Sequence, residues 1–290
     1  MLVREPIVAG QFYPGSRAAC LKQIKAMRPA APPENLPARP VAGIVPHAGW
    51  TFSGSTALAV LDAIRSRRTP ATFVLFGAAH HAVRTSALFG SGTWETPLGP
   101  VEVDERLARE ILARADAPLA DDPMAHEDEH SIEVQLPLIK HLFPEAKIVP
   151  ITVPPTNLAA DVGRCVARTI LTLDADAVCL GSTDLTHYGP AYGFVPRGTG
   201  EAAVRWVREE NDRRMIDLAL RLDADGAVAE AAAHSNACGS GAVAATLAAA
   251  RALGAERGCL VAYTTSFDVM KEQFGRSDSS AVVGYAGVVF

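Results

Sequence analysis

Buried strand-like runs alternate with helical segments along this chain, and this alternation limits the possible folds more than any other feature. Residues 41–47 form an apolar run, residues 53–67 repeat apolar side chains with a helical period, and residues 71–77 form a second apolar run. The same order of strand, helix and strand returns within residues 147–182. Units of this kind place their strands in parallel, with right-handed crossovers. The pattern predicts an α/β fold with a mostly parallel central sheet and helices on both faces.

The remaining segments predict further helices and strands around this sheet. Helices are expected at 17–28, 104–115, 131–142, 201–221, 224–233 and 239–253, and strands in a hairpin around 85–98 and in closing runs at 258–266 and 281–290. A stretch rich in glycine and proline, 188–200, is expected to form a lid over the site. The chain has no internal repeat, and we expect one domain over residues 1–290.

Composition excludes several classes of partner. Hydrophobic residues make up 49% of the chain, enough for a large core without disulfide bonds. The formal net charge is −5 and no run of Lys and Arg occurs, so neither nucleic acid nor a membrane surface is an expected partner. No apolar stretch reaches the ~18 residues of a membrane span, and the N-terminus does not resemble a signal peptide. We expect a cytoplasmic protein.

Histidines follow two of the strand-like runs. His47 ends the run 41–47, and the pair His80 and His81 comes just after the run 71–77. The carboxyl ends of parallel strands meet in one crevice of such a sheet, and we expect these two strands to be neighbours. Two imidazoles there suit zinc, iron or copper, while the other histidine of the pair is left to hydrogen-bond locally. A purely structural role for His47 is the alternative.

An acidic residue and a histidine follow a later strand. In the string "STDLTHYG", Asp184 and His187 lie three residues apart, just past the run that ends at Ser182. A carboxylate beside an imidazole fixes its tautomer and raises its basicity, as a general acid or base requires. The same string is also typical of a turn. Both interpretations stay open from these residues alone.

The alanine-rich segment "NACGSGAVAATLAAARAL" places Cys238 at the first turn of an expected helix. The first turn of a helix lowers the pKa of a thiol and favours the thiolate, which binds metals and attacks electrophiles. The five cysteines of the chain are widely spaced and lack CxxC pairing, so no disulfide framework is expected. The alternative for Cys238 is a small packed residue.

The string His126-Glu127-Asp128-Glu129-His130 matches the HExxH motif of zinc proteases. That motif requires both histidines on one helix face. Here Pro123 lies upstream and the apolar helical period begins only at Ile132, so the string reads as the entrance of a helix. We expect no protease site, although Glu129 and His130 are candidates to face the crevice.

Taken together, seven strings resemble the Memo family, whose bacterial and archaeal members are called AmmeMemoRadiSam system protein B. The strings are "REPIVAGQFYPG", "PHAGWTFSGSTA", "GAAHH", "EDEHSIEVQLP", "STDLTHYG", "NACGSG" and "SSAVVGYAG". They occur in the family's order and span nearly the whole chain. The fold of the family is similar to that of class III extradiol dioxygenases, non-haem iron enzymes that open catechol rings.

The resemblance implies a role for each candidate residue. His47, His80 and Cys238 match the family's metal ligands, and Asp184 and His187 match further pocket residues, with His187 where the dioxygenases carry their acid/base histidine. The dioxygenases bind iron with two histidines and a glutamate, so the cysteine here is a departure that alters the redox chemistry. The substrate-binding candidates are His81, Glu129 and His130.

Three functions follow as hypotheses. The first is a metal-binding, dioxygenase-like redox protein that holds iron(II), with copper or zinc as alternatives, and acts on a small molecule. The second is a non-catalytic module that binds a peptide or protein, because relatives in animals are associated with peptide recognition and those in prokaryotes occur beside Ammecr-type and radical SAM proteins. The third is a zinc hydrolase that uses His126 and His130.

Overall fold

Four parallel strands form the middle of one large sheet. The computed structural model describes residues 2–27, 33–81, 83, 85–114 and 117–290. The four strands lie side by side in the order β2 (Ala42–Val45), β9 (Ala177–Ser182), β3 (Thr72–Gly77) and β8 (Lys147–Thr152). Their burial matches the continuous apolar runs of the sequence, because a parallel sheet is covered on both faces. The predicted α/β class is confirmed.

The sheet as a whole is mixed. The prediction of a mostly parallel sheet holds for the four central strands but is wrong for the strands on either side of them. Beside β2 lie β12 (Val282–Val289), β11 (Cys259–Thr265) and β10 (His187–Tyr188), and beside β8 lie β4 (Ser86–Leu88) and β7 (Leu119–Asp121). Within the described residues, four of the eight pairings of this sheet are antiparallel. The βα alternation covers only the central strands, and the closing strands enter by antiparallel pairing instead.

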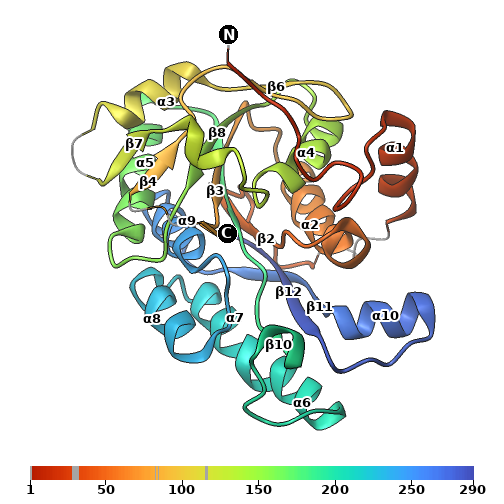
Figure 1. The fold of residues 1–290 in the computed structure, drawn as a ribbon. Helices are drawn as coiled ribbons and strands as arrows, with labels where there is room; N and C mark the ends of the chain where they lie inside the picture. The colour runs from red at the N-terminus through yellow and green to blue at the C-terminus, as the bar shows by residue number, and fades with distance from the viewer. Residues whose placement is uncertain (1, 28–32, 82, 84, 115–116) are drawn as a thin grey trace.

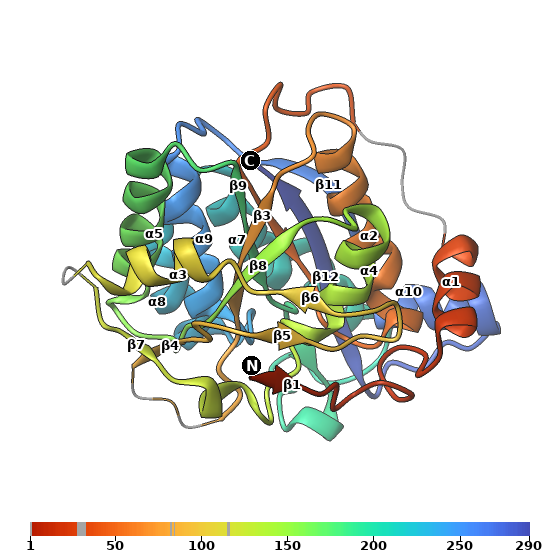
Figure 2. The same ribbon diagram turned by 90° about the horizontal axis from the view of Figure 1, so that it is seen from above.

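Helices cover both faces of the sheet, as predicted. In Figures 1 and 2, α2 (Trp50–Arg65) and α4 (Leu136–Leu142) lie on one face, and α5 (Ala159–Leu173) and α9 (Ser240–Ala252) lie on the other. The last two helices pack very closely, since a Cβ added at Gly163 of α5 would lie 1.9 Å from the carbonyl oxygen of Ala245 in α9. A glycine is therefore required at that crossing.

Further helices surround these layers. They are α1 (Arg17–Ala26), α3 (Glu105–Leu112), α6 (Glu201–Trp206), α7 (Asp212–Leu220), α8 (Ala224–His234) and α10 (Ser266–Phe274). The helix expected at 201–221 is interrupted by a π-helical turn, Val207–Asn211. In the part of the chain that the structure describes, no helix is long and apolar enough to cross a membrane.

The hairpin expected around 85–98 does not form. Its first half is β4 of the large sheet, whereas its second half, β5 (Thr93–Trp94), pairs with β1 (Val3–Arg4) and β6 (Val101–Glu102) in a separate sheet of three strands. The N-terminal strand supplies a partner that local sequence could not indicate.

A buried ion pair fixes the N-terminus to the segment before α4. The Arg4 guanidinium lies 2.7 Å from the Glu133 carboxylate and also donates to the carbonyl oxygens of His126 and Glu129. Glu133 accepts three further hydrogen bonds, from the backbone N–H groups of residues 7 and 8 and the Tyr13 hydroxyl. Charged groups that are buried need this density of partners. The pair therefore holds segment 126–133 in an irregular conformation.

We predict that Arg4→Met lowers the free energy of unfolding by about 3 kcal/mol, because it leaves a buried carboxylate without its cation. Denaturant unfolding measures this loss. Arg164→Met is the matched control, since the ion pair of Arg164 with Asp161 is partly exposed and contributes under about 1 kcal/mol. Equal midpoints for the two variants would contradict the prediction.

Candidate metal centre

Three histidines converge at the carboxyl ends of the parallel strands. His47 follows β2, His80 follows β3, and His130 lies in the irregular segment before α4. Each offers a ring nitrogen within 4.8 Å of the other two. The His47 ring is nearly perpendicular to both others, whereas His80 and His130 are stacked with an interplanar angle of 9°. The structure thus brings His130 into the cluster, where sequence had made it only a substrate-binding candidate.

The strands that carry His47 and His80 are not neighbours, contrary to the prediction. Strand β9 lies between them, and its last residue, Ser182, takes part in the site. The Ser182 hydroxyl donates to the carbonyl oxygen of Ser131 at 2.8 Å, so it is free to accept from Nδ1 of His47 at 3.0 Å. That tautomer leaves Nε2 of His47 with its lone pair. Burial, reinforced by the neighbouring histidines, holds the His47 pKa well below its usual range.

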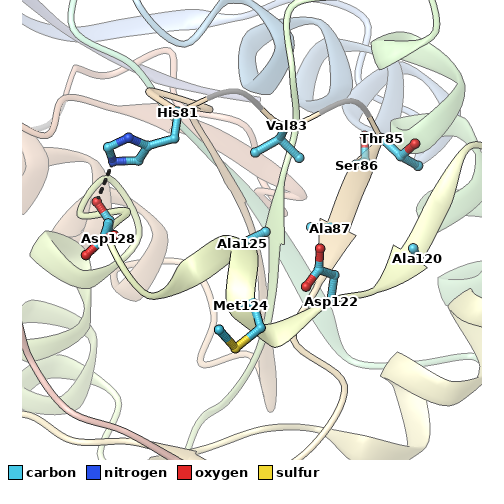
Figure 3. A pocket seen from close by; sticks show the side chains of 10 residues that line it. All are labelled: His81, Val83, Thr85, Ser86, Ala87, Ala120, Asp122, Met124, Ala125 and Asp128. Carbon is cyan, nitrogen blue, oxygen red and sulfur yellow. Dashed lines mark hydrogen bonds between the residues drawn. The ribbon is translucent and has the colours of Figure 1, made fainter.

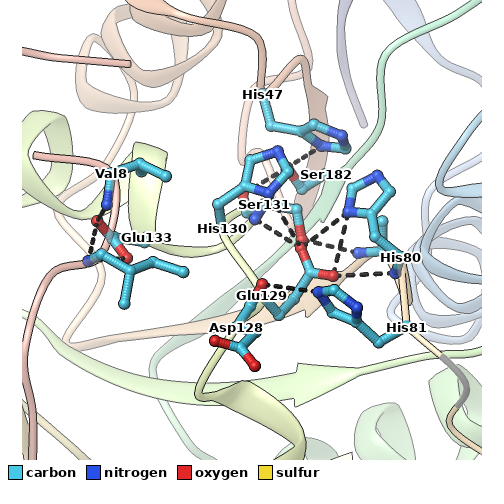
Figure 4. A network of polar contacts seen from close by, with 12 residues as sticks. Val8, His47, His80, His81, Asp128, Glu129, His130, Ser131, Glu133 and Ser182 are labelled. Carbon is cyan, nitrogen blue, oxygen red and sulfur yellow. Dashed lines mark hydrogen bonds and ion pairs between the residues drawn. The ribbon is translucent and has the colours of Figure 1, made fainter. Parts of the chain in front are cut away.

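Glu129 fixes the second histidine. Its carboxylate accepts from Nδ1 and from the backbone N–H of His80, each at 3.0 Å, and from the backbone N–H of Ser131 (Figure 4). Burial opposes ionisation of both partners, but their mutual hydrogen bond and charge prevail, so the pKa of Glu129 is lowered and that of His80 is raised. Nε2 of His80 is left for a ligand. A carboxylate behind a histidine is the usual arrangement around metal-binding imidazoles.

Cys238 lies against His47. Its Sγ is 3.2 Å from Nε2 of His47 and accepts from the backbone N–H of Asp184 at 3.3 Å. Helix α9 begins only at Ser240, so Cys238 precedes the first turn. Burial, with the nearby Asp184 charge, raises the pKa of the thiol, and the expected lowering by the helix terminus does not prevail. A thiolate at this position therefore needs a cation beside it.

Asp184 and His187 do not form the expected hydrogen-bonded pair in the described part of the chain. The Asp184 carboxylate accepts from the backbone N–H of His47 at 2.7 Å and of Ala48 at 3.3 Å, and burial raises its pKa to about 7 despite these bonds. Nδ1 of His187 bonds the carbonyl oxygen of Leu185 at 3.1 Å instead. His187 is thus oriented by its own turn, and Asp184 shapes the backbone that carries His47.

A cavity of about 560 Å³ opens beside the cluster. His47, His80, His130, Asp184 and His187 all line it, and no Lys or Arg of the described residues does. Its other walls were missed by sequence reasoning and are mainly aromatic or apolar, among them Phe12, Phe52, Tyr192, Met270, Val283 and Tyr285. From the predicted lid, 188–200, Tyr192 reaches the cavity, where its ring meets that of His187 edge to face at 5.0 Å.

Two substrate-binding candidates do not line this cavity. Glu129 is buried behind His80, as described above. His81 points the other way, and its Nε2 lies 2.9 Å from the carbonyl oxygen of Asp128. It borders a second cavity of about 500 Å³ with Met124 and Asp122 (Figure 3). The adjacent histidines therefore diverge, one toward the cluster and one toward a local partner, as the sequence suggested.

The HExxH string does not form a zinc-protease helix. His126 ends a short 3₁₀ helix, Pro123–His126, and is fully buried. Its Nε2 lies 3.0 Å from the carbonyl oxygen of Ala87, and its Nδ1 lies 3.3 Å from the Thr152 hydroxyl. Both nitrogens are thus occupied by the core, while His130 faces the cavity. The structure therefore agrees with the expectation that this string does not form a protease site.

The donor set suits a transition metal. Imidazole and thiolate ligands together are typical of zinc, iron and copper sites. Nitrogen and sulfur atoms that share one ion lie about 3.2–3.6 Å apart, given metal bonds of about 2.0–2.1 and 2.3 Å. The 3.2 Å between Nε2 of His47 and Sγ of Cys238 agrees with that spacing. The residues present therefore fit a metal.

Comparisons with known proteins show which family the chain resembles. The family model described as "Memo-like protein" matches residues 4–289. A MEMO1 family protein of Thermococcus onnurineus is 39% identical over 300 residues, covering 100% of this chain and 99% of the relative. Another, from Pyrococcus horikoshii, is 37% identical over 99% of this chain and 98% of its own length. An uncharacterized protein of Escherichia coli K12 shares the fold, with a TM-score of 0.54 at 13% identity over 86% of this chain and 99% of that chain.

We predict that His126 makes stability fall in mild acid. Burial lowers its pKa from 6.5 to about 4, so between these values the unfolded chain binds a proton that the folded protein does not. The contribution is present above pH 6.5 and declines by roughly 3 kcal/mol as the pH falls to 4. The destabilisation caused by His126→Gln, measured by denaturant unfolding, should therefore shrink from pH 7 to pH 4.

The exposed His141 provides the control, because replacing an exposed side chain by His141→Gln should change the free energy of unfolding by under about 0.5 kcal/mol at pH 7. A destabilisation by His126→Gln that is the same at both pH values would refute the prediction.

Proposed function

Because the chain belongs to the Memo family, we propose that it is a metal-binding, dioxygenase-like redox protein that holds iron, or alternatively copper, and acts on a small molecule in the cavity. The observation that carries this proposal is the paired fixation of His47 and His80. Each is held through Nδ1, by Ser182 and Glu129 respectively, so that both Nε2 atoms remain for a metal. Histidines that bind metals usually donate their other ring N–H to an acceptor of this kind.

We assign the third ligand to Cys238. The lone pair of an imidazole nitrogen lies in the ring plane, so two parallel, stacked rings direct their lone pairs along separate planes. Their stacking argues that His80 and His130 do not both bind the ion, and the hydrogen bond from Nδ1 of His80 to Glu129 favours His80. Cys238 lies at ligand spacing from His47. The set matches the family resemblance of these three residues.

Iron or copper in this set supplies one-electron redox chemistry and a Lewis-acid position for the substrate. The protein contributes proton handling. Nδ1–H of His187 donates to the carbonyl oxygen of Leu185, which leaves Nε2 as the acceptor on the cavity side. Burial lowers the His187 pKa, so the ring is neutral near pH 7 and able to accept a proton from a bound substrate.

We predict that His47→Ala and Cys238→Ser each weaken metal binding by about a hundredfold or more. Removing a residue that only hydrogen-bonds to a metal ligand already costs up to about a hundredfold, and removing a ligand should cost at least as much. Metal content after anaerobic purification is the measurement, with His141→Ala as the control. His130→Ala should keep its metal to within about twofold, since removing a residue that is not a ligand leaves the coordination bonds intact. Full occupancy in Cys238→Ser together with an empty His130→Ala would replace this set by three histidines.

We predict that His187→Ala slows oxygen uptake by about a hundredfold or more, the usual contribution of a general base. The assay measures oxygen consumption by the iron-loaded protein with a panel of catechols and thiols. The His187→Ala protein must contain as much iron as the wild type, so that a slower rate does not reflect loss of the metal. Steady uptake that survives the substitution would contradict the assigned role, and a fully loaded wild type that consumes no oxygen with any compound would favour a non-catalytic binding module.

A further inference from the structure

One polar group that lines the cavity beside the metal cluster has no partner among the residues that the structure describes. Tyr285 is 2% exposed and lines the cavity, yet its hydroxyl makes no hydrogen bond within the described residues. Other tyrosine hydroxyls are satisfied, since buried Tyr188 donates to the carbonyl oxygen of Gly198 and half-buried Tyr263 donates to the Asp212 carboxylate. The Tyr285 hydroxyl is thus left free to donate a hydrogen bond into the cavity that the residue lines.

The position of Tyr285 is set by a rigid part of the sheet. It lies on β12, opposite Thr264 of β11. Side chains two apart on a strand share a face, so Tyr285 and Val283 point the same way, and both line the cavity. Val283 is paired directly with His187 of β10, which places His187 on this face as well. The sheet therefore presents Tyr285 and His187 to the same space.

The surroundings keep the Tyr285 phenol protonated and uncharged, so that it can donate a hydrogen bond. Burial, and after it the charge of Asp184, raises the pKa of the phenol, so its proton stays on the oxygen. No Lys or Arg of the described residues lines the cavity, and the nearby apolar walls include Phe12, Phe52 and Met270. A ligand that suits these walls has a flat apolar body and an oxygen that accepts a hydrogen bond.

We propose that the Tyr285 hydroxyl donates a hydrogen bond to an oxygen of the small molecule that occupies this cavity, and so positions it against the metal cluster. The inference builds on the function proposed above and adds a residue to that site.

Tyr285→Phe tests this role, with 4-nitrocatechol as the probe. Its oxygens accept hydrogen bonds, and its absorption reports binding. Zinc-loaded protein is titrated, because zinc performs no redox chemistry and the probe is not consumed. We expect Tyr285→Phe to bind the probe about tenfold more weakly at equal zinc content, since a hydrogen bond to a charged oxygen is worth about 1.5–3 kcal/mol. Its melting temperature should stay close to that of wild type, because the Tyr285 hydroxyl makes no hydrogen bond within the described residues.

Tyr263→Phe is the matched control. It removes a hydroxyl from the adjacent strand, but that hydroxyl serves Asp212 outside the cavity. This variant should melt at a lower temperature and bind the probe as wild type does. The opposite pattern, with Tyr285→Phe melting lower and its probe affinity unchanged, would show a purely structural phenol and overturn the proposal.

A titration of the metal-free protein separates this proposal from the function on which it rests. If wild type binds no metal, the metal site fails, yet a tenfold effect of Tyr285→Phe on probe affinity would still support the hydrogen bond. If wild type binds zinc and Tyr285→Phe binds the probe equally well in both forms, the role of Tyr285 fails and the metal site stands.

Discussion

The buried ion pair between Arg4 and Glu133 is the interaction on which the site depends. Segment 126–133 has little regular structure to hold it, and Arg4 binds two of its carbonyl oxygens besides the Glu133 carboxylate. This segment delivers Glu129 behind His80 and His130 beside it. Losing the pair would therefore cost more than stability, because the carboxylate that orients one metal-facing imidazole would lose its support.

The site combines rigid and adaptable parts. His47 and His80 are each held by a hydrogen bond that leaves Nε2 available, and these bonds come from the end of β9 and from segment 126–133. The thiol of Cys238 is different, since burial keeps its proton on until a cation arrives. Metal binding at this set would thus release a proton from sulfur, whereas the His47 imidazole, whose pKa burial lowers, is already in the neutral form that binds metal.

Sequence periodicity predicted reliably those helices and strands that are determined by neighbouring residues in the chain. The βα alternation located the four central strands and most helices to within a few residues, and with them the strand ends that carry His47, His80 and Asp184. The proline and the delayed apolar period before α4 also removed the HExxH string from consideration, and His126 is indeed buried in the core. Predictions that required pairing partners did worse, since the hairpin around 85–98 and the adjacency of β2 and β3 were both wrong.

The sequence by itself determined the class of the fold and which chemical groups stand at the ends of its strands, because periodicity and strand ends are local properties. Only the tertiary structure decided which of those groups meet. Strand β9 between β2 and β3, the contact of Cys238 with His47, and the contact of Arg4 with Glu133, 129 residues apart, all depend on packing between distant segments. The unpartnered hydroxyl of Tyr285 belongs with them, since hydrogen-bond satisfaction is a property of the folded neighbourhood and leaves no trace in a local pattern.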